Sequence, residues 1–270
     1  MDKNPNITGK IRHALAIGLC LSVLLLQGCA TNSSSDSRRA ADAPVLADSV
    51  ANESLLKAAG NHAGLVELYK NQLKTAPDVQ TEDASRYLLG QAYLDARDPD
   101  STLFYINPVV SAGRANAKML LLQSRAYLDL EQQGDALQAA VDAMALDPKD
   151  PHIANQLGLI YADMGSFSEA RRFFHKARQG MLDDVIVMNN LAMIDILEKK
   201  YRSAVERLMP LYNTGQADDR ITANLVVALV LGGMYEEFKA VYTGARTEQE
   251  RVQLFRALSE MKAVSLSAAQ

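Results

Sequence analysis

The sequence predicts an all-α protein in which about six helix–turn–helix repeats stack into a solenoid, with one further helix covering the C-terminal end. Two observations lead to this fold class. Residues of the same kind return every 34 positions between residues 83 and 252, a period typical of two helices joined by a turn. The composition agrees, because 48% hydrophobic and 22% charged residues are ordinary for a globular helical protein.

The repeat at 151–184 is the clearest. It has the large apolar residue Leu157 and small residues where helices must approach closely, namely Gly158, Ala170 and Ala177. Aromatic residues, Tyr161 and Phe174, lie beside them, and Gly165 stands at the turn. These residues resemble the tetratricopeptide (TPR) pattern at positions 7, 8, 11, 15, 20, 24 and 27, counted from the first residue of the repeat. The repeat departs from the pattern at position 32, where Leu182 replaces the usual proline.

Steps of 34 residues place four more repeats in the same frame, at 83–116, 117–150, 185–218 and 219–252. A sixth repeat begins at residue 46 in a shifted frame, with about three extra residues near 80–82 before the next one. The amphipathic run at 247–262 is expected to form the capping helix. The solenoid should therefore occupy 46–262, followed by a disordered tail at 263–270.

One second helix carries a proline in its interior. Pro108 lies in the repeat at 83–116, and a proline inside a helix removes an amide donor and clashes with the preceding turn. That helix is expected to be kinked or short.

Charge and motif content exclude several function classes. The net charge is −4, and it becomes −6 without residues 1–28, so no general attraction to nucleic acid is expected. No HExxH, CxxC, GxGxxG, GxxxxGK[ST] or GxSxG motif occurs, and His152 and His175 fall at solvent-facing repeat positions. The sequence therefore predicts a non-enzymatic protein with no cofactor, no metal site and no small-molecule substrate.

The N-terminus has the features of an export signal. A basic start precedes the 13-residue, mostly apolar run 14–26, which is too short to cross a bilayer. The run ends in Leu26-Gln27-Gly28-Cys29, which resembles the lipobox of bacterial lipoproteins. The resemblance implies cleavage of 1–28, lipidation of Cys29 with palmitate among its acyl chains, and a flexible tether over 29–45. The alternative is an ordinary cleaved signal in which Cys29 is incidental.

The residue after the cysteine bears on location. Among enteric lipoproteins, a residue other than Asp at this position favours the outer membrane, and Ala30 occupies it here. A lipid-anchored protein on the periplasmic face of the outer membrane is therefore expected.

The first helices of the repeats carry the candidate binding residues. In TPR proteins, positions 2, 5, 6, 9, 12 and 13 point into the concave groove, which here gives two asparagine ladders and an apolar stretch: Asn155, Asn189, Asn190, Asn224, Leu159, Met193, Ile196, Leu197, Val227 and Leu231. Side-chain amides can hold an extended peptide backbone, and an apolar patch suits a partner's amphipathic helix. Alternatively, the asparagines bond one another and some apolar residues are buried between helices.

A more specific resemblance rests on two adjacent repeats. Asn189-Asn190-Leu191-Ala192 is followed one repeat later by Asn224-Leu225, Ala228-Leu229 and Gly233. This is similar to the TPR lipoprotein of the tight-adherence (Flp) pilus assembly system. The resemblance implies a role in assembling the pilus apparatus and its secretin channel, through protein partners. Two other roles stay open, namely a type IV pilus pilotin-like lipoprotein that delivers a secretin, and an envelope adaptor that tethers cell-wall hydrolases or proteases.

Overall fold

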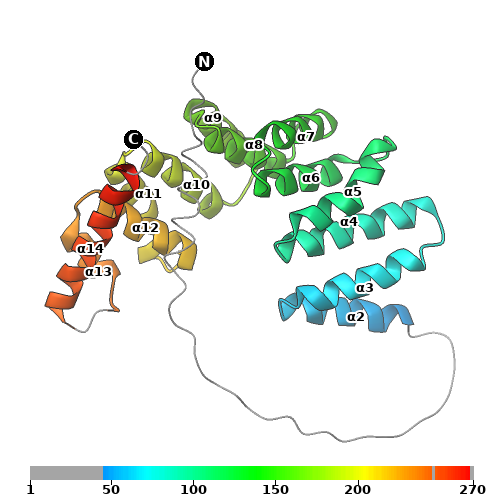
Figure 1. Ribbon diagram of the computed structural model, residues 1–270, viewed down its shortest axis with the longest axis horizontal. Coiled ribbons are helices and arrows are strands. Elements are labelled where there is room, and N and C mark those ends of the chain that lie inside the picture. Colours follow the sequence, from blue (N-terminus) through cyan, green and yellow to red (C-terminus); the bar gives the residue numbers. More distant parts are fainter. Residues whose placement is uncertain (1–44, 245–246, 268–270) are drawn as a thin grey trace, which may run out of the picture. The chain divides into compact units, whose positions relative to one another are not determined.

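The computed structural model describes residues 45–244 and 247–267 and confirms the predicted fold class. These residues form thirteen α-helices and contain no strand (Figure 1). No helix in the two described ranges is both long enough and apolar enough to cross a membrane. The signal, Cys29 and residues 30–44 of the expected tether lie outside the described residues.

Twelve of the described helices follow one another along the chain in six consecutive pairs, two helices in the sequence range of each predicted repeat. The pairs are α2 (Val45–Ala58) with α3 (His62–Lys74), α4 (Val79–Asp95) with α5 (Pro99–Ser111), α6 (Ala117–Asp129) with α7 (Gln133–Leu146), α8 (Pro151–Asp163) with α9 (Phe167–Gln179), α10 (Asp184–Leu197) with α11 (Tyr201–Asn213), and α12 (Asp219–Leu231) with α13 (Tyr235–Val241). The final helix is α14 (Glu248–Ser267).

The chain divides into two compact halves, with the boundary between Gln132 and Gln133. In the N-terminal half, α3, α4, α5 and α6 pack in sequence order. Tyr69 and Leu89 are central to one buried cluster, and Ile106 and Leu122 are central to a second. Each cluster joins residues from successive repeats, so burial of apolar surface holds neighbouring repeats together.

The C-terminal half contains α7 to α14 and has the larger clusters. One is centred on Phe174 and Leu191, and the other extends from Ala192 to Val241. Helix α14 packs against α12, and its Phe255 ring meets Phe238 at 5.1 Å between ring centroids. As predicted, α14 covers apolar residues of the last repeat that have no further repeat to pack against.

The turn inside every repeat has the same backbone conformation. Position 15 is left-handed in all six repeats, with glycine in three of them and Arg97, Glu131 and Lys199 in the others. In the clearest repeat, the Gly165 amide donates to Ala162 and the next amide donates to Tyr161. This pair of bonds is the Schellman motif, which satisfies the last carbonyls of the first helix.

The turns between repeats explain the missing proline at position 32. Met181 is left-handed, and the Leu182 amide donates to the carbonyl of Ala177 at 3.0 Å. A proline at position 32 has no amide and could not form this bond. Repeats that keep the proline, at Pro77 and Pro148, have no left-handed residue before it. The chain therefore uses two different connections between its repeats.

Acidic residues at the repeat boundaries cap the following helices. Asp183 accepts a hydrogen bond from the amide of Val185 at 2.7 Å, and Asp218 accepts one from Ile221 at 2.7 Å. These bonds satisfy amides at the start of α10 and α12 that have no partner within the helix.

Two alanine substitutions of glycine should have opposite effects on stability. Gly165→Ala places a side chain on a left-handed residue with nothing within 4 Å of the new Cβ, so the expected loss of about 1–2 kcal/mol is a backbone effect. Gly134→Ala, the matched control, lies in the first turn of α7, where space is also open and alanine should stabilise by about 0.5–1 kcal/mol. Thermal unfolding followed by circular dichroism measures both, and equal shifts would contradict the assignment of the turn.

Both helices of the repeat at 83–116 differ from the prediction. Helix α5 contains Pro108 but runs for 13 residues, the same length as α9, so the expected shortening is wrong. The carbonyl that Pro108 cannot bond belongs to Phe104, whose side chain is 71% exposed, and water can therefore hydrate this part of the helix. Helix α4 begins at Val79, so the three extra residues near 80–82 extend a helix rather than separate two repeats.

The C-terminal end also departs from the expected boundaries. The second helix of the last repeat, α13, has only seven residues and ends at Val241, three residues before Gly244, which is a poor helix former. By contrast, α14 continues to Ser267, into the tail predicted to be disordered. Neither Gly nor Pro occurs between Glu248 and the end of the chain, so no residue of the strongest helix-breaking types stops that helix.

Candidate partner-binding face

Three consecutive first helices of the C-terminal half carry the ten predicted partner-binding residues. These helices are α8, α10 and α12, and α10 packs against both of the others. Their first turns are fixed by the capping aspartates Asp150, Asp183 and Asp218. We call the ten residues the candidate face: Asn155, Leu159, Asn189, Asn190, Met193, Ile196, Leu197, Asn224, Val227 and Leu231.

The four asparagines form two bridges between neighbouring first helices. Asn190 Nδ2 donates to Asn155 Oδ1 at 2.8 Å, which links α10 to α8. Asn224 Nδ2 donates to Asn189 Oδ1 at 2.9 Å, which links α12 to α10. Each bond joins position 5 of one repeat to position 6 of the next, at a spacing of 35 residues, and does not join the predicted ladder partners, which are 34 residues apart. The asparagines bond one another, which is the alternative that the sequence left open.

Burial limits the access of a partner to the asparagine side chains. Asn189 and Asn224 are 3% and 5% exposed, and Asn190 is 8% exposed, whereas Asn155 is half-buried. Each amide group has two donor hydrogens and two acceptor lone pairs, so a single bridge leaves bonding capacity on every side chain. The bridges order the face, and contact of these amides with a partner peptide stays a prediction.

The six apolar residues of the face divide into two groups. Ile196 is 8% exposed and belongs to the core cluster of the last two repeats, so it packs between helices. The other five are half-buried and retain part of their surface: Leu159, Met193, Leu197, Val227 and Leu231. Val227 and Leu231 also contact that core cluster at its edge. The accessible apolar surface is therefore supplied by positions 9 and 13 of the repeats.

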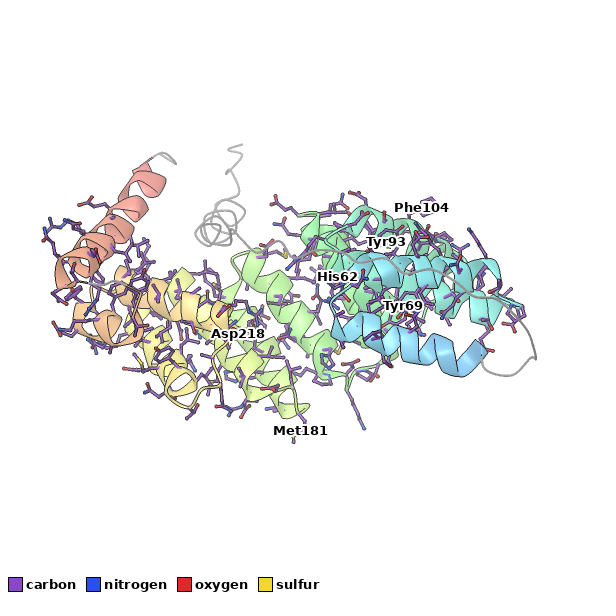
Figure 2. All side chains as sticks on the ribbon, turned by 90° about the horizontal axis from the view of Figure 1, so that it is seen from below. His62, Tyr69, Tyr93, Phe104, Met181 and Asp218 are labelled. Atoms are coloured by element: carbon purple, nitrogen blue, oxygen red, sulfur yellow. The ribbon has the colours of Figure 1, made fainter. Side chains whose placement is uncertain are left out.

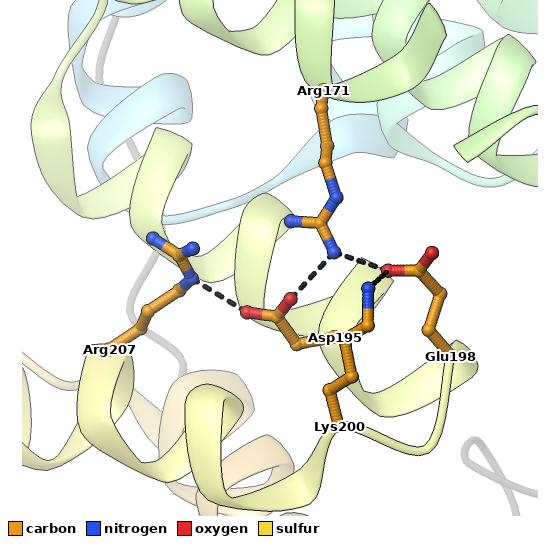
Figure 3. Close-up of polar contacts among 5 residues, drawn as sticks. All are labelled: Arg171, Asp195, Glu198, Lys200 and Arg207. Atoms are coloured by element: carbon orange, nitrogen blue, oxygen red, sulfur yellow. Dashed lines mark hydrogen bonds and ion pairs between the residues drawn. The ribbon is translucent and has the colours of Figure 1, made fainter. Parts of the chain in front are cut away.

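A charged cluster lies in the same half of the chain and was not predicted. Arg171 Nη2 lies 2.6 Å from Asp195 Oδ1 and 2.5 Å from Glu198 Oε2, and Arg207 Nε lies 2.6 Å from Asp195 Oδ2 (Figure 3). Lys200 pairs with Glu198 at 3.0 Å. The bond from Arg171 holds the pKa of the Glu198 carboxyl below its usual value.

The burial of Asp195 makes this cluster unusual. Its side chain is only 3% exposed, and both of its oxygens accept charge-assisted bonds from arginines of two other helices, α9 and α11. The sequence contains an indication of this cluster, because Asp195 stands at position 11, where this chain has tyrosine in the three preceding repeats. An acid at an aromatic position of a repeat indicates a buried polar network.

The histidines of the C-terminal half belong neither to the charged cluster nor to the candidate face. His152 and His175 are exposed, as predicted from their repeat positions. Within the described ranges, no group of three or more His, Cys, Asp or Glu side chains is arranged to hold a metal ion.

Met181 is 88% exposed on the loop before α10, and Figure 2 shows it projecting away from the ribbon, as Phe104 does in the N-terminal half.

Comparison with known proteins identifies the fold but no close relative. No family model matches the sequence, and no curated protein matches it either. A thermophilic TPR protein of Thermus thermophilus has a similar structure, with a TM-score of 0.58 and 19% identity over 68% of this chain and 98% of that one. A tetratricopeptide repeat protein from Parabacteroides merdae has a TM-score of 0.59 and 14% identity, over 83% of this chain and 88% of the other.

PilF of Pseudomonas aeruginosa is a third similar structure. It has a TM-score of 0.56 and 16% identity, and the match covers 78% of this chain and 96% of that protein. At identities below 25% these likenesses establish the fold alone. The chain therefore has the tetratricopeptide-repeat fold.

Proposed function

We propose that this protein is a non-enzymatic, lipid-anchored scaffold on the periplasmic face of the outer membrane, where it assembles a tight-adherence (Flp) pilus and its secretin. It binds secretin or other assembly proteins through the candidate face. The observation that carries the proposal is the row of amide and half-buried apolar side chains on α8, α10 and α12, because it offers protein partners both polar and apolar contacts.

The N-terminal sequence supports the lipid anchor. A basic start, a short apolar run, Gly28 and Cys29 occur in the order that a lipoprotein signal requires. A single acyl chain holds a protein only marginally to a bilayer, whereas two or more hold it stably, so a lipidated Cys29 is a sufficient attachment. About 16 tether residues would span roughly 20–25 Å and let the repeats reach partners beside the membrane.

The pilus assignment is supported by the residues at the centre of the candidate face. Asn189-Asn190-Leu191-Ala192 and the Asn224-Leu225 run one repeat later are the motifs shared with the tight-adherence lipoprotein. Three of these asparagines, together with Asn155, form the bridges described above, so the resemblance falls on the candidate face.

Replacing the lipidated residue tests the anchor. Cys29→Ser removes the only sulfur that the signal presents for acylation, so palmitate labelling should disappear and the protein should leave the membrane fraction. Cys20→Ser, within the cleaved segment, is the control and should keep both labelling and membrane association. Continued labelling of the Cys29 variant would refute the anchor.

Gene deletion tests the pilus role separately. Cells without the protein should lose secretin multimers and pili, and the Cys29→Ser protein should restore them poorly because it is no longer held at the membrane. Normal multimers and normal piliation in the deletion strain would refute the assembly role, even if the protein proves to be lipidated.

Partner binding should depend on the face and not on exposed apolar residues in general. Met193→Asp puts a charge at the centre of the half-buried apolar row, and it should weaken binding of the partner by about tenfold or more while helicity stays near native. Met181→Asp is the matched control, because it makes the same change on an exposed loop of the same half of the chain. Co-precipitation with the secretin measures both, and equal losses would place the binding site elsewhere.

A further inference from the structure

Three charged residues of the cluster in Figure 3 occupy positions that are apolar or aromatic in most of the other repeats. Position 11, where Asp195 stands, is Tyr or Leu in the other five repeats. Position 23, where Arg207 stands, is Leu, Tyr, Ala, Phe or Val. Position 21, where Arg171 stands, is Val or Leu in four others and Lys239 in the last. All three substitutions meet at one interface between repeats.

Equivalent positions elsewhere show what the charges replace. In the repeat at 151–184, Tyr161 and Phe173 at positions 11 and 23 stack with centroids 5.4 Å apart. Tyr93 and Tyr105 stack in the same way at 5.6 Å in the N-terminal half. In the repeat at 185–218 this aromatic pair is exchanged for an ion pair between Asp195 and Arg207.

The third member of the set comes from the preceding repeat. Arg171 belongs to α9, the second helix of repeat 151–184, and it reaches Asp195 on α10, the first helix of the next repeat. The three residues Arg171, Asp195 and Arg207, which we call the ionic triad, therefore join two repeats as well as the two helices of one repeat.

Apolar interfaces alone discriminate poorly between similar repeats. Hydrophobic burial is non-directional, so a second helix with an apolar surface can pack against the first helix of several repeats or of another copy of the chain. The ionic triad removes this freedom for α9. If α9 packed against a first helix with tyrosine or leucine at position 11, the Arg171 guanidinium would lose its carboxylate inside the contact, which is strongly unfavourable.

We propose that the ionic triad is a register key, which ensures that repeat 151–184 stacks only on repeat 185–218 and on no other repeat of this chain or of a second copy. The key acts by penalising the wrong pairing, in the same way that a single polar residue selects one register in a coiled coil. It makes one interface of the C-terminal half different from all its neighbours, and so disfavours off-register pairing of repeats within one chain or between two chains.

An apolar version of the interface tests the key. The variant Arg171→Leu, Asp195→Tyr, Arg207→Phe uses residues that this chain has at the same positions of other repeats. It should fold, since apolar replacement of a buried ion pair is often neutral or stabilising. Two differently tagged copies of the full chain are unfolded together in detergent and refolded, and the fraction of mixed oligomers is measured by co-precipitation and light scattering. We expect this fraction to rise about tenfold or more above that of the native chain.

A variant with a second ionic triad in the same chain distinguishes an effect on the register of the repeats from an effect on their stability. The variant Leu137→Arg, Tyr161→Asp, Phe173→Arg builds the same triad one repeat earlier, so every charge has a partner but the key is no longer unique. Mixed oligomers should increase here too, although the number of ion pairs has doubled. Arg172→Gln, which removes one charge from an exposed side chain of α9, is the control and should refold like the native chain.

The outcomes distinguish a key from a structural ion pair. Clean refolding of both triple variants, with no more mixed oligomers than the native chain, would overturn the proposal. Loss of helicity in the apolar variant would also overturn it, because the triad would then be needed to hold the fold rather than to choose the pairing.

Discussion

Replacing Asp195 with alanine should lower the free energy of unfolding by about 3 kcal/mol, near the lower end of the range for broken buried ion pairs. The carboxylate is 3% exposed, and its loss leaves the Arg207 guanidinium without its acceptor. Arg171 keeps Glu198 as a partner, which holds the loss at this end of the range. The thermal midpoint of the transition that includes α9, α10 and α11 should fall by about 6–12 °C.

The same substitution on the same helix provides the control. Asp184 begins α10 and pairs with Arg178 at 2.8 Å, but both side chains are largely exposed, so solvent screens the pair. Asp184→Ala should therefore leave the midpoint nearly unchanged. Differential scanning calorimetry compares the two variants, and equal shifts would show that burial of the carboxylate is unimportant.

A methyl group added at Gly158 should destabilise the C-terminal half by about 1–3 kcal/mol, the usual range for overpacking. A Cβ at this position would lie 2.5 Å from Cδ1 and Cε1 of Phe174, which is buried and cannot move freely. Positions 8 and 24 must therefore match in size. The next repeat shows another solution, because Ala192 and Leu208 occupy these positions there and both are buried.

That natural pair predicts a rescue. The double variant Gly158→Ala, Phe174→Leu copies the combination found one repeat later, so it should be more stable than the sum of its single changes predicts. A double-mutant cycle of urea unfolding measures the coupling between the two sites. Additive losses would contradict the size rule, since they would mean that the new methyl group and the phenyl ring do not compete for space.

The 34-residue frame predicts most of the fold from the sequence. It sets the place of five helix pairs and of the turn glycine at Gly165, and it puts the four asparagines on neighbouring first helices, whereas the first helix pair lies in a shifted frame. Helix ends depend on local details that the frame does not contain. Pro108 is tolerated because the carbonyl it leaves unbonded lies beside an exposed residue, and only the structure shows this exposure.

Burial within the candidate face was harder to predict than its composition. Position 12 holds Ile196, and whether it faces a partner or the core depends on how closely α10, α11 and α12 pack, which the sequence does not state. Asp195 was recognisable as an exception at an aromatic position. Its two arginines were not, because Arg171 lies 24 residues away in another repeat and ordinary surface arginines look the same in a sequence.

The uniform turn inside the repeats has a practical consequence. Its shape comes from backbone bonds, and the side chains of Arg97, Glu131 and Lys199 extend into solvent at the same place in three repeats. Cysteine introduced there would find no competing thiol in the chain beyond Cys20 and Cys29. Fluorophores attached at these sites would report distances between repeats in living cells without touching the core or the candidate face.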